Sequence, residues 1–372
     1  MKVLITGGGT GGHIYPALAI AKKIKEEHPD SSIVYVGTKN SMESEIVPKE
    51  GFNFKSIRVK GFRRKLSMDT LKSIKELALG LNDARKLIKE FSPDIVIGTG
   101  GYVCGPLVLI SSLKGIPTLI HEQNALPGIT NRILSKFTDK IAASFEESKK
   151  YFKDSSKVTI TGNPIRKEIV NIKEINKSSA YRSLGITSQK KTVLSFGGSG
   201  GQKSLNDAME EVIAKNINND DIQIIHVTGK RLYDNFVEGI ESKGINLSTH
   251  KNIKVLPYLF EMPKAQSIAN LIITGGGALS IAEINAIGKA SIIIPKAYAT
   301  DNHQEFNAKA LEDEGAGVMV LEKELSGEKL NNLIIDLLKN ERKLRRMEQN
   351  SKRIGITDSA DRIIAIINQM VK

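Results

Sequence analysis

The chain has 372 residues, a length at which one hydrophobic core usually gives way to two domains, and 40% of its residues are hydrophobic, as in ordinary globular proteins. Its single cysteine, Cys104, excludes an intrachain disulfide and fits a buried residue in a reducing cytoplasm. The net charge of +13 favours an anionic partner, but only 5% of residues are aromatic and none is tryptophan, so we expect no nucleic-acid partner.

The first predicted element is a strand over residues 3–6, followed by five glycines within residues 7–12 and a helical pattern over 14–24. Glycine lets backbone amides approach a ligand closely, and a helix N-terminus carries roughly half a positive charge. The turn is therefore a candidate phosphate site. The same pattern returns at residues 193–202, which predicts two similar halves facing one cleft.

Short apolar runs alternate with helical patterns along both halves. In the first half, strands are expected at 32–36, 54–59, 94–97, 117–121, 140–143 and 158–160, and helices at about 69–90, 107–113 and 129–136. In the second half, strands are expected at 192–196, 222–227, 253–256, 271–274, 291–294 and 317–320, with a helical tail from 326. This alternation predicts an α/β protein with parallel sheets covered by helices on both faces.

Residues 95–113 carry no charge, which raises the possibility of a membrane span. Several glycines and Pro106 interrupt this stretch, so a strand, a glycine loop and a helix explain it better.

Gly7, Gly9 and Gly12 fit the G-x-G-x-x-G pattern of dinucleotide-binding domains. That assignment also needs an acidic residue at the end of the second strand, to bind the ribose. Here the second strand ends in Val36-Gly37-Thr38, so the pattern does not favour a nicotinamide-dependent dehydrogenase.

Six motifs in one order carry a family resemblance: GGTGGH at 8–13, GGY at 100–102, HEQN at 121–124, GNPIR at 162–166, GGS at 197–199 and GALSIAE at 277–283. Together they resemble the MurG family of bacterial peptidoglycan glycosyltransferases, in glycosyltransferase family 28. The resemblance implies the GT-B architecture, with two Rossmann-like domains whose parallel sheets face each other across a cleft. It implies an acceptor- and membrane-binding domain over 1–164, joined by a C-terminal helix at about 354–372, and a UDP-sugar-binding domain over 165–353.

The resemblance also implies the reaction and its place in the cell. The activity would be the inverting transfer of N-acetylglucosamine from UDP-N-acetylglucosamine to the muramyl 4-hydroxyl of undecaprenyl-pyrophosphoryl-linked muramyl-pentapeptide (lipid I), giving lipid II. This is a step of cell-wall synthesis, which serves cell shape and division, at the cytoplasmic face of the bacterial cell membrane. The alternatives are a related transferase with another lipid acceptor, such as diacylglycerol, and a noncatalytic nucleotide-sugar-binding subunit.

His13 directly follows the first glycine loop. An imidazole titrates near neutrality and can take the proton of an attacking sugar hydroxyl, so we interpret His13 as the general base, although it could instead orient the loop or touch phosphate. Arg166 can offset the charge of the departing diphosphate, and the carboxylate of Glu283 can accept both ribose hydroxyls. The donor-binding residues implied by the motifs are Thr10, Gly11, Gly12, Asn124, Arg166, Ser199, Leu259, Ala278, Leu279, Ser280, Glu283, His303 and Gln304.

For the acceptor, the resemblance points to the loops of the first half. Gly100, Gly101 and Tyr102 would form an amide nest for its pyrophosphate, or a purely structural turn. His121 and Glu122 would hydrogen-bond the acceptor, or form a buried structural pair. No D-x-D carboxylate pair adjoins the nucleotide motifs, so we expect no metal and no cofactor. Glycine at 200 and 275, where the family often has glutamine and arginine, puts donor affinity in question.

A basic and apolar stretch begins near residue 58. Basic residues around an apolar face suit an anionic membrane surface, although the leucines of this stretch could equally face the core. The predicted membrane patch consists of Phe62, Arg63, Arg64, Lys65, Leu66, Met68, Leu71, Lys72, Ile74 and Lys75.

Overall fold

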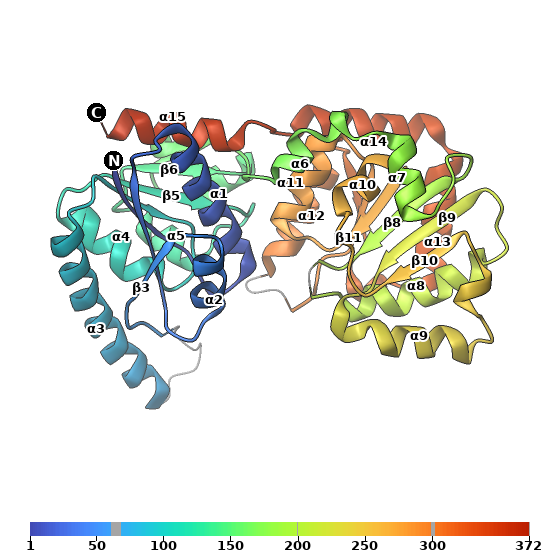
Figure 1. Ribbon diagram of the computed structural model, residues 1–372, viewed down its shortest axis with the longest axis horizontal. Coiled ribbons are helices and arrows are strands. Elements are labelled where there is room, and N and C mark those ends of the chain that lie inside the picture. The colour runs from blue at the N-terminus through green and yellow to red at the C-terminus, as the bar shows by residue number, and fades with distance from the viewer. Residues whose placement is uncertain (61–67, 199, 299–301, 372) are drawn as a thin grey trace. The chain divides into compact units, whose positions relative to one another are not determined.

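The computed structural model describes residues 1–60, 68–198, 200–298 and 302–371, without the side chains of 68–74. The chain divides into two compact units (Figure 1). Unit 1 comprises Met1–Ile165 and Thr357–Lys372, and unit 2 comprises Arg166–Ile356. The division expected from the sequence, at 164 and about 354, lies within three residues of these bounds.

The described part of unit 1 contains a sheet of seven parallel strands in the order β3-β2-β1-β4-β5-β6-β7. From β1 the chain builds outward to β3 and then restarts at β4 on the other side of β1. The strands β1 and β4 therefore flank a topological switch point, where open α/β sheets bind their ligands. The strands are β1 (Lys2–Thr6), β2 (Ser32–Gly37), β3 (Asn53–Ser56), β4 (Ile95–Gly98), β5 (Thr118–Glu122), β6 (Lys140–Ala143) and β7 (Val158–Ile160).

Helices cover both faces of this sheet, and alternate residues of the strands pack on opposite faces. Val3 and Ile5 of β1 pack with α1, α2 and α15, whereas Leu4 packs with α3, α4 and α5. The C-terminal helix lies along α1, and Ser359 at its start donates a hydrogen bond to Gly162 O at 2.8 Å. The helices are α1 (Gly11–Glu27), α2 (Met42–Lys49), α3 (Met68–Phe91), α4 (Cys104–Leu113), α5 (Ile129–Leu134) and α15 (Ser359–Met370).

The described part of unit 2 repeats this plan with six parallel strands in the order β10-β9-β8-β11-β12-β13. Its switch point lies between β8 and β11. The strands are β8 (Lys191–Phe196), β9 (Ile222–Val227), β10 (Ile253–Leu256), β11 (Leu271–Thr274), β12 (Ser291–Ile293) and β13 (Gly317–Met319).

The core of unit 2 also lies on both faces of its sheet. Val193 of β8 packs with α8, α9, α13 and α14, whereas the next residue, Leu194, packs with α7, α10 and α11. The helices are α6 (Lys167–Val170), α7 (Lys177–Leu184), α8 (Lys203–Asn216), α9 (Tyr233–Ser242), α10 (Met262–Ile268), α11 (Ala278–Ile287), α12 (His303–Asp313), α13 (Gly327–Lys339) and α14 (Glu341–Ile354).

The predicted class, α/β with two Rossmann-like parallel sheets, is confirmed. Three strands end earlier than predicted: β12 and β13 by one residue each, and β3 at Ser56 rather than residue 59. Beyond the end of β3, Arg58 turns to Asp83 on α3 and donates to it through both its backbone and its guanidinium. Residues 95–113 form β4, a glycine loop and α4, with Cys104 buried as expected. Within the described ranges, no helix has the length and apolarity needed to cross a membrane.

Candidate active site

The first glycine loop leaves β1 at the switch point of unit 1 and packs backbone to backbone against the loop after β4. Gly8 N donates to Gly100 O at 3.3 Å. A Cβ on Gly101, whose φ is +83°, would lie 2.3 Å from Gly8 O, and one on Gly7 would lie 2.0 Å from Thr99 Oγ1. Glycine is therefore required here because any side chain would separate the two loops.

His13 lies in the first turn of α1, and its ring packs against the loop that follows β4. A Cβ on Gly100 would lie 2.8 Å from His13 Cδ2 and 3.0 Å from Nε2. His13 Nδ1 lies 3.0 Å from Gly8 O and 3.4 Å from Thr10 Oγ1. A carbonyl oxygen can only accept, so the shorter contact is a hydrogen bond when the neutral ring carries its hydrogen on Nδ1 and leaves Nε2 unprotonated. The structure thus brings together the predicted base and the predicted Gly100-Gly101-Tyr102 nest.

An unpredicted carboxylate, that of Glu43, lies against the first glycine loop. Glu43, in the first turn of α2, is completely buried. Its Oε2 accepts from Gly9 N at 3.3 Å, and its Oε1 accepts from the backbone N and hydroxyl of Thr38 at 3.2 and 2.9 Å. Burial acts to raise the pKa of Glu43, but hydrogen bonds from its own backbone, Ser41 and Thr38 outweigh it and hold the pKa below its ordinary value.

Sequence signals for this glutamate were present but indirect. The dinucleotide-binding pattern has its acidic residue at the end of β2, whereas Glu43 stands six residues beyond Gly37. It lies in a helix that begins with the Ser41 and Ser44 capping box. Ordinary helix starts carry acids, so the pattern alone gave no reason to place this one at the glycine loop.

His121 and Glu122, at the end of β5, are buried in a hydrogen-bonded network. His121 Nε2 lies 3.2 Å from Gly162 O, its Nδ1 lies 2.9 Å from Gln123 Nε2, and burial lowers its pKa to about 4. Glu122 accepts from both amide groups of Asn124 and from the side chain of Asn131. Of the two roles left open by the sequence, this geometry favours the structural one and offers the acceptor no exposed surface.

The second glycine loop leaves β8 at the switch point of unit 2; its Ser199 lies outside the described residues. Lys296, which follows β12 and was not predicted, donates from Nζ to Gly201 O at 2.8 Å, and burial lowers its pKa. Its backbone N–H donates to Gln304 Oε1 at 3.0 Å, so the predicted donor-binding residues His303 and Gln304, at the start of α12, lie at this edge of the sheet.

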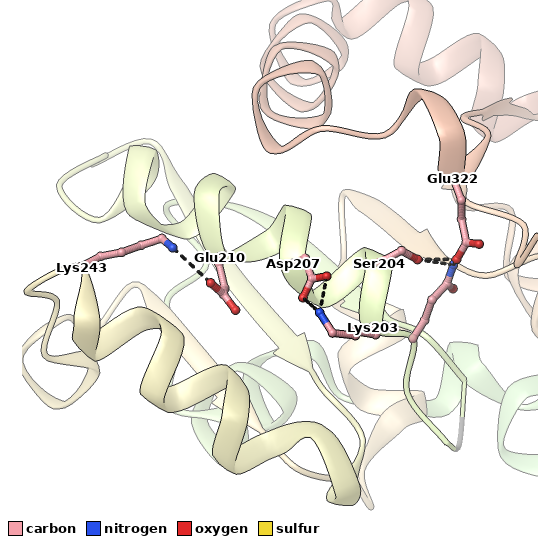
Figure 2. Close-up of polar contacts among 7 residues, drawn as sticks. Lys203, Ser204, Asp207, Glu210, Lys243 and Glu322 are labelled. Atoms are coloured by element: carbon pink, nitrogen blue, oxygen red, sulfur yellow. Dashed lines mark hydrogen bonds and ion pairs between the residues drawn. The ribbon is translucent and has the colours of Figure 1, made fainter.

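A second unpredicted carboxylate supports the start of α8. Glu322 follows β13, and Figure 2 shows it pointing toward Ser204. It also accepts from Gln202 Nε2 at 2.9 Å and from Ala297 N at 2.7 Å. Burial acts to raise the pKa of Glu322, but these hydrogen bonds together outweigh it and hold the pKa below its ordinary value.

Arg166 and Glu283, predicted to bind diphosphate and ribose, form a bidentate ion pair. Arg166 Nε and Nη2 lie 2.6 and 2.7 Å from the two carboxylate oxygens of Glu283. Glu283 is in the second turn of α11, whose first turn contains the predicted Ala278, Leu279 and Ser280. Only 12% of the Glu283 side chain is exposed. The bidentate pair with arginine fixes the orientation of the carboxylate and leaves lone pairs on its oxygens for a ligand.

The loop before α10 contains Leu259, one of the predicted donor-binding residues, nearly buried between two exposed aromatic residues. The rings of Tyr258 and Phe260 meet edge to face at 4.8 Å, and 83% of Phe260 is exposed. Large exposed aromatic side chains mark this loop as a candidate surface for a planar ring.

The two unusual glycines differ in their surroundings. A Cβ on Gly275 would lie 3.0 Å from Gln202 Oε1, so a larger residue there would press on Gln202. A Cβ on Gly200 would meet no atom of the described residues within 4 Å, so packing does not require glycine at that position.

Half of the predicted membrane patch falls outside the described residues, namely Phe62, Arg63, Arg64, Lys65 and Leu66. Met68, Leu71, Lys72 and Ile74 belong to the first turns of α3, where side chains are not described, and Lys75 is exposed on the same helix. Further along α3, Leu81 packs against the core, as the alternative interpretation expected for the leucines. Across the described residues, no three His, Cys, Asp or Glu side chains are grouped as metal ligands.

The fold and this geometry define a protein of two Rossmann-like units, each with a glycine loop at its switch point. The glycosyltransferase family 28 N-terminal domain matches residues 3–143, and the family 28 C-terminal domain matches residues 192–363. The chain therefore belongs to glycosyltransferase family 28, which confirms the predicted resemblance.

Individual proteins are similar to this chain over nearly its whole length. A protein of Acetivibrio thermocellus named UDP-N-acetylglucosamine–N-acetylmuramyl-(pentapeptide) pyrophosphoryl-undecaprenol N-acetylglucosamine transferase is 49% identical, over 100% of this chain and 99% of that protein. A protein of the same name from Clostridioides difficile is 50% identical, over 98% of this chain and 87% of that protein. The crystal structure of MurG from Acinetobacter baumannii covers 99% of both chains with a TM-score of 0.79 at 27% identity.

Glu283→Ala is expected to weaken UDP-N-acetylglucosamine binding about tenfold or more, because a hydrogen bond to a charged group is worth about 1.5–3 kcal/mol. Titration calorimetry measures this change. Glu210→Ala is the matched control, since Glu210 is also a partly buried, ion-paired glutamate of unit 2, with Lys243 as its partner (Figure 2). Equal affinities in the two variants would remove Glu283 from the donor site.

Proposed function

We propose that this chain transfers N-acetylglucosamine from UDP-N-acetylglucosamine to the muramyl 4-hydroxyl of lipid I, with inversion at the anomeric carbon, and so forms lipid II. The observation that carries the proposal is the full-length similarity to relatives whose name states this transfer. The two glycine loops and the histidine at the first of them supply groups suited to the chemistry.

The donor is assigned mainly to unit 2. The amides of the second glycine loop and the N-terminus of α11 would receive the diphosphate, and Glu283 would accept hydrogen bonds from the ribose. Leu259 would pair with uracil through its backbone, and His303 and Gln304 would contact the sugar hydroxyls. Donor contacts of Thr10, Gly11, Gly12 and Asn124, in unit 1, are proposed from the sequence motifs alone.

The geometry of His13 supports its role as general base. Nδ1 donates to the Gly8 carbonyl, which leaves Nε2 as the nitrogen that accepts a proton. The muramyl hydroxyl would give its proton to Nε2 while its oxygen attacks the anomeric carbon from the face opposite the leaving UDP. A single displacement of this kind inverts the configuration. Gly100, Gly101 and Tyr102 would hold the acceptor pyrophosphate beside His13.

The acceptor is a lipid, so the protein would work as a peripheral protein at the cytoplasmic face of the bacterial membrane. Basic and apolar residues of the 62–75 stretch would contact the anionic surface, at about 1 kcal/mol per lysine or arginine near it. The net charge of +13 supports this assignment.

Turnover with labelled UDP-sugars tests the proposed reaction directly. The purified single chain should transfer N-acetylglucosamine to lipid I and not to diacylglycerol. Transfer to diacylglycerol instead would support the related lipid glycosyltransferase. Donor binding without transfer to either acceptor would support the noncatalytic subunit.

His13→Ala should reduce kcat by about 10²–10⁴-fold, the usual contribution of general-base catalysis, while UDP-N-acetylglucosamine still binds. The donor contacts at the first loop are backbone amides and persist in the variant, whereas the attacking hydroxyl loses its proton acceptor. Calorimetry and rate measurements separate the two effects. Near-normal turnover would make His13 a structural residue.

Truncating Phe62, Leu66 and Met68 to alanine, with charge reversal at Arg63 and Arg64, should release the protein from anionic vesicles in a flotation assay. Turnover of a water-soluble acceptor analogue should persist, because the catalytic groups lie elsewhere. A parallel loss of both activities would assign the stretch to folding or to the active site.

A further inference from the structure

The peptide group between Gly8 and Gly9 lies between two ionisable side chains. Its carbonyl oxygen, on Gly8, is 3.0 Å from His13 Nδ1, and its N–H, on Gly9, donates to Glu43 Oε2 at 3.3 Å. Hydrogen bonds in such a chain polarise one another, so an anion at the N–H end makes the carbonyl oxygen a stronger acceptor. The carboxylate and the imidazole are therefore coupled through one peptide group, although they do not touch.

We infer that Glu43 is a positioning residue for His13, acting through the Gly8–Gly9 peptide to hold the proton on Nδ1 and the ring in place. The inference deepens the proposed function and takes from it the role of His13 as base. A carboxylate that orients a catalytic histidine through Nδ1 is a recurring arrangement in enzymes, and here a peptide group would stand between the two.

The loop is shaped to hold this carboxylate. A Cβ on Gly8 would lie 2.7 Å from Glu43 Oε1, and one on Gly37 would lie 2.6 Å from Glu43 Cγ. Thr38 holds Oε1 through two hydrogen bonds, which leaves Oε2 aimed at Gly9. An acid that only stabilised the N-terminus of α2 would not need the space left by Gly8 and Gly37, because it could remain exposed to solvent. Glu45, in the same turn, is exposed in this way.

The neighbouring titratable groups do not supply the charge. From β2, the Tyr35 hydroxyl donates to Gly7 O at 2.7 Å, and burial raises its pKa well above the ordinary value. From α4, the Cys104 thiol donates to Thr6 O and Gly100 O, and burial raises its pKa to about 12. The loop after β4 adds Tyr102, next to Gly9. Tyr35 and Cys104 are neutral at physiological pH, so the negative charge at this loop is that of Glu43.

Glu43→Gln tests the inference because it removes the charge and keeps the length of the side chain. We expect kcat to fall about tenfold, the equivalent of one pKa unit, with unchanged donor affinity by calorimetry. The acid limb of the rate profile should move to lower pH, because the imidazolium loses a nearby anion. The matched control is Glu45→Gln, which makes the same change at an exposed position of the same helix turn and should alter neither quantity.

A double-mutant cycle with His13→Ala separates positioning from folding. If Glu43 acts through His13, the double variant is no slower than His13→Ala alone, whereas multiplied losses would overturn the inference. Should Glu43→Gln fail to fold, Thr38→Val loosens the same carboxylate and should show the same dependence on His13. An inactive wild type, or a His13→Ala variant as active as the wild type, would count against the proposed function instead.

Nitrogen-15 NMR of the histidine rings tests the inference without substrate. His13 should carry its proton on Nδ1 when neutral, and its titration should move to lower pH in Glu43→Gln and stay in place in Glu45→Gln. A titration of His13 that Glu43→Gln leaves unchanged would overturn the coupling whatever reaction the protein catalyses.

Discussion

The close approach of two backbone loops at the switch point of unit 1 is the constraint on which the candidate site depends. Parallel strands β1 and β4 pair directly, so the loops that leave them start a strand spacing apart. Gly7 and Gly101 let these loops touch without intervening side chains. The contact fixes the position of the Gly8 carbonyl, and that carbonyl fixes His13. The proposed general base, His13, is thereby oriented by a main-chain atom.

The sequence predicted the fold closely because its signals are local. Strands such as β9 and β11 are rich in β-branched residues and are bounded by polar residues or glycine, and their observed limits are those expected. The glycine loops were placed at the carboxyl ends of strands for the same reason. The largest exception is β3, which ends three residues early. Arg58, just beyond it, pairs with Asp83 on α3, 25 residues further along the chain, and no local pattern reports such a contact.

The candidate site was predicted less completely because its interactions are long-range. Glu43 meets a loop 34 residues earlier in the chain, and Arg166 meets Glu283 117 residues later. The sequence suggested both members of the second pair separately and gave them different ligands. His121 illustrates the reverse case: its position at the end of a strand suggested function, whereas burial and two hydrogen-bond partners favour a structural role. Composition does not distinguish these outcomes, because each depends on which atoms the fold brings within hydrogen-bonding distance.

The two glycine loops look alike in sequence but differ in the charged side chains that contact them. This difference bears on which loop receives the diphosphate. In unit 1 the buried carboxylate of Glu43 takes up the Gly9 amide, which leaves the amides at the start of α1 for a ligand. In unit 2 the ammonium of Lys296 lies against the loop at Gly201, while Glu322 is directed to the side chains of Gln202 and Ser204 and to Ala297 N. A diphosphate is repelled by a carboxylate and attracted by an ammonium, and both effects are stronger where water is excluded. The charges of the described residues therefore favour the loop after β8 for the diphosphate and leave the loop after β1 to orient the histidine.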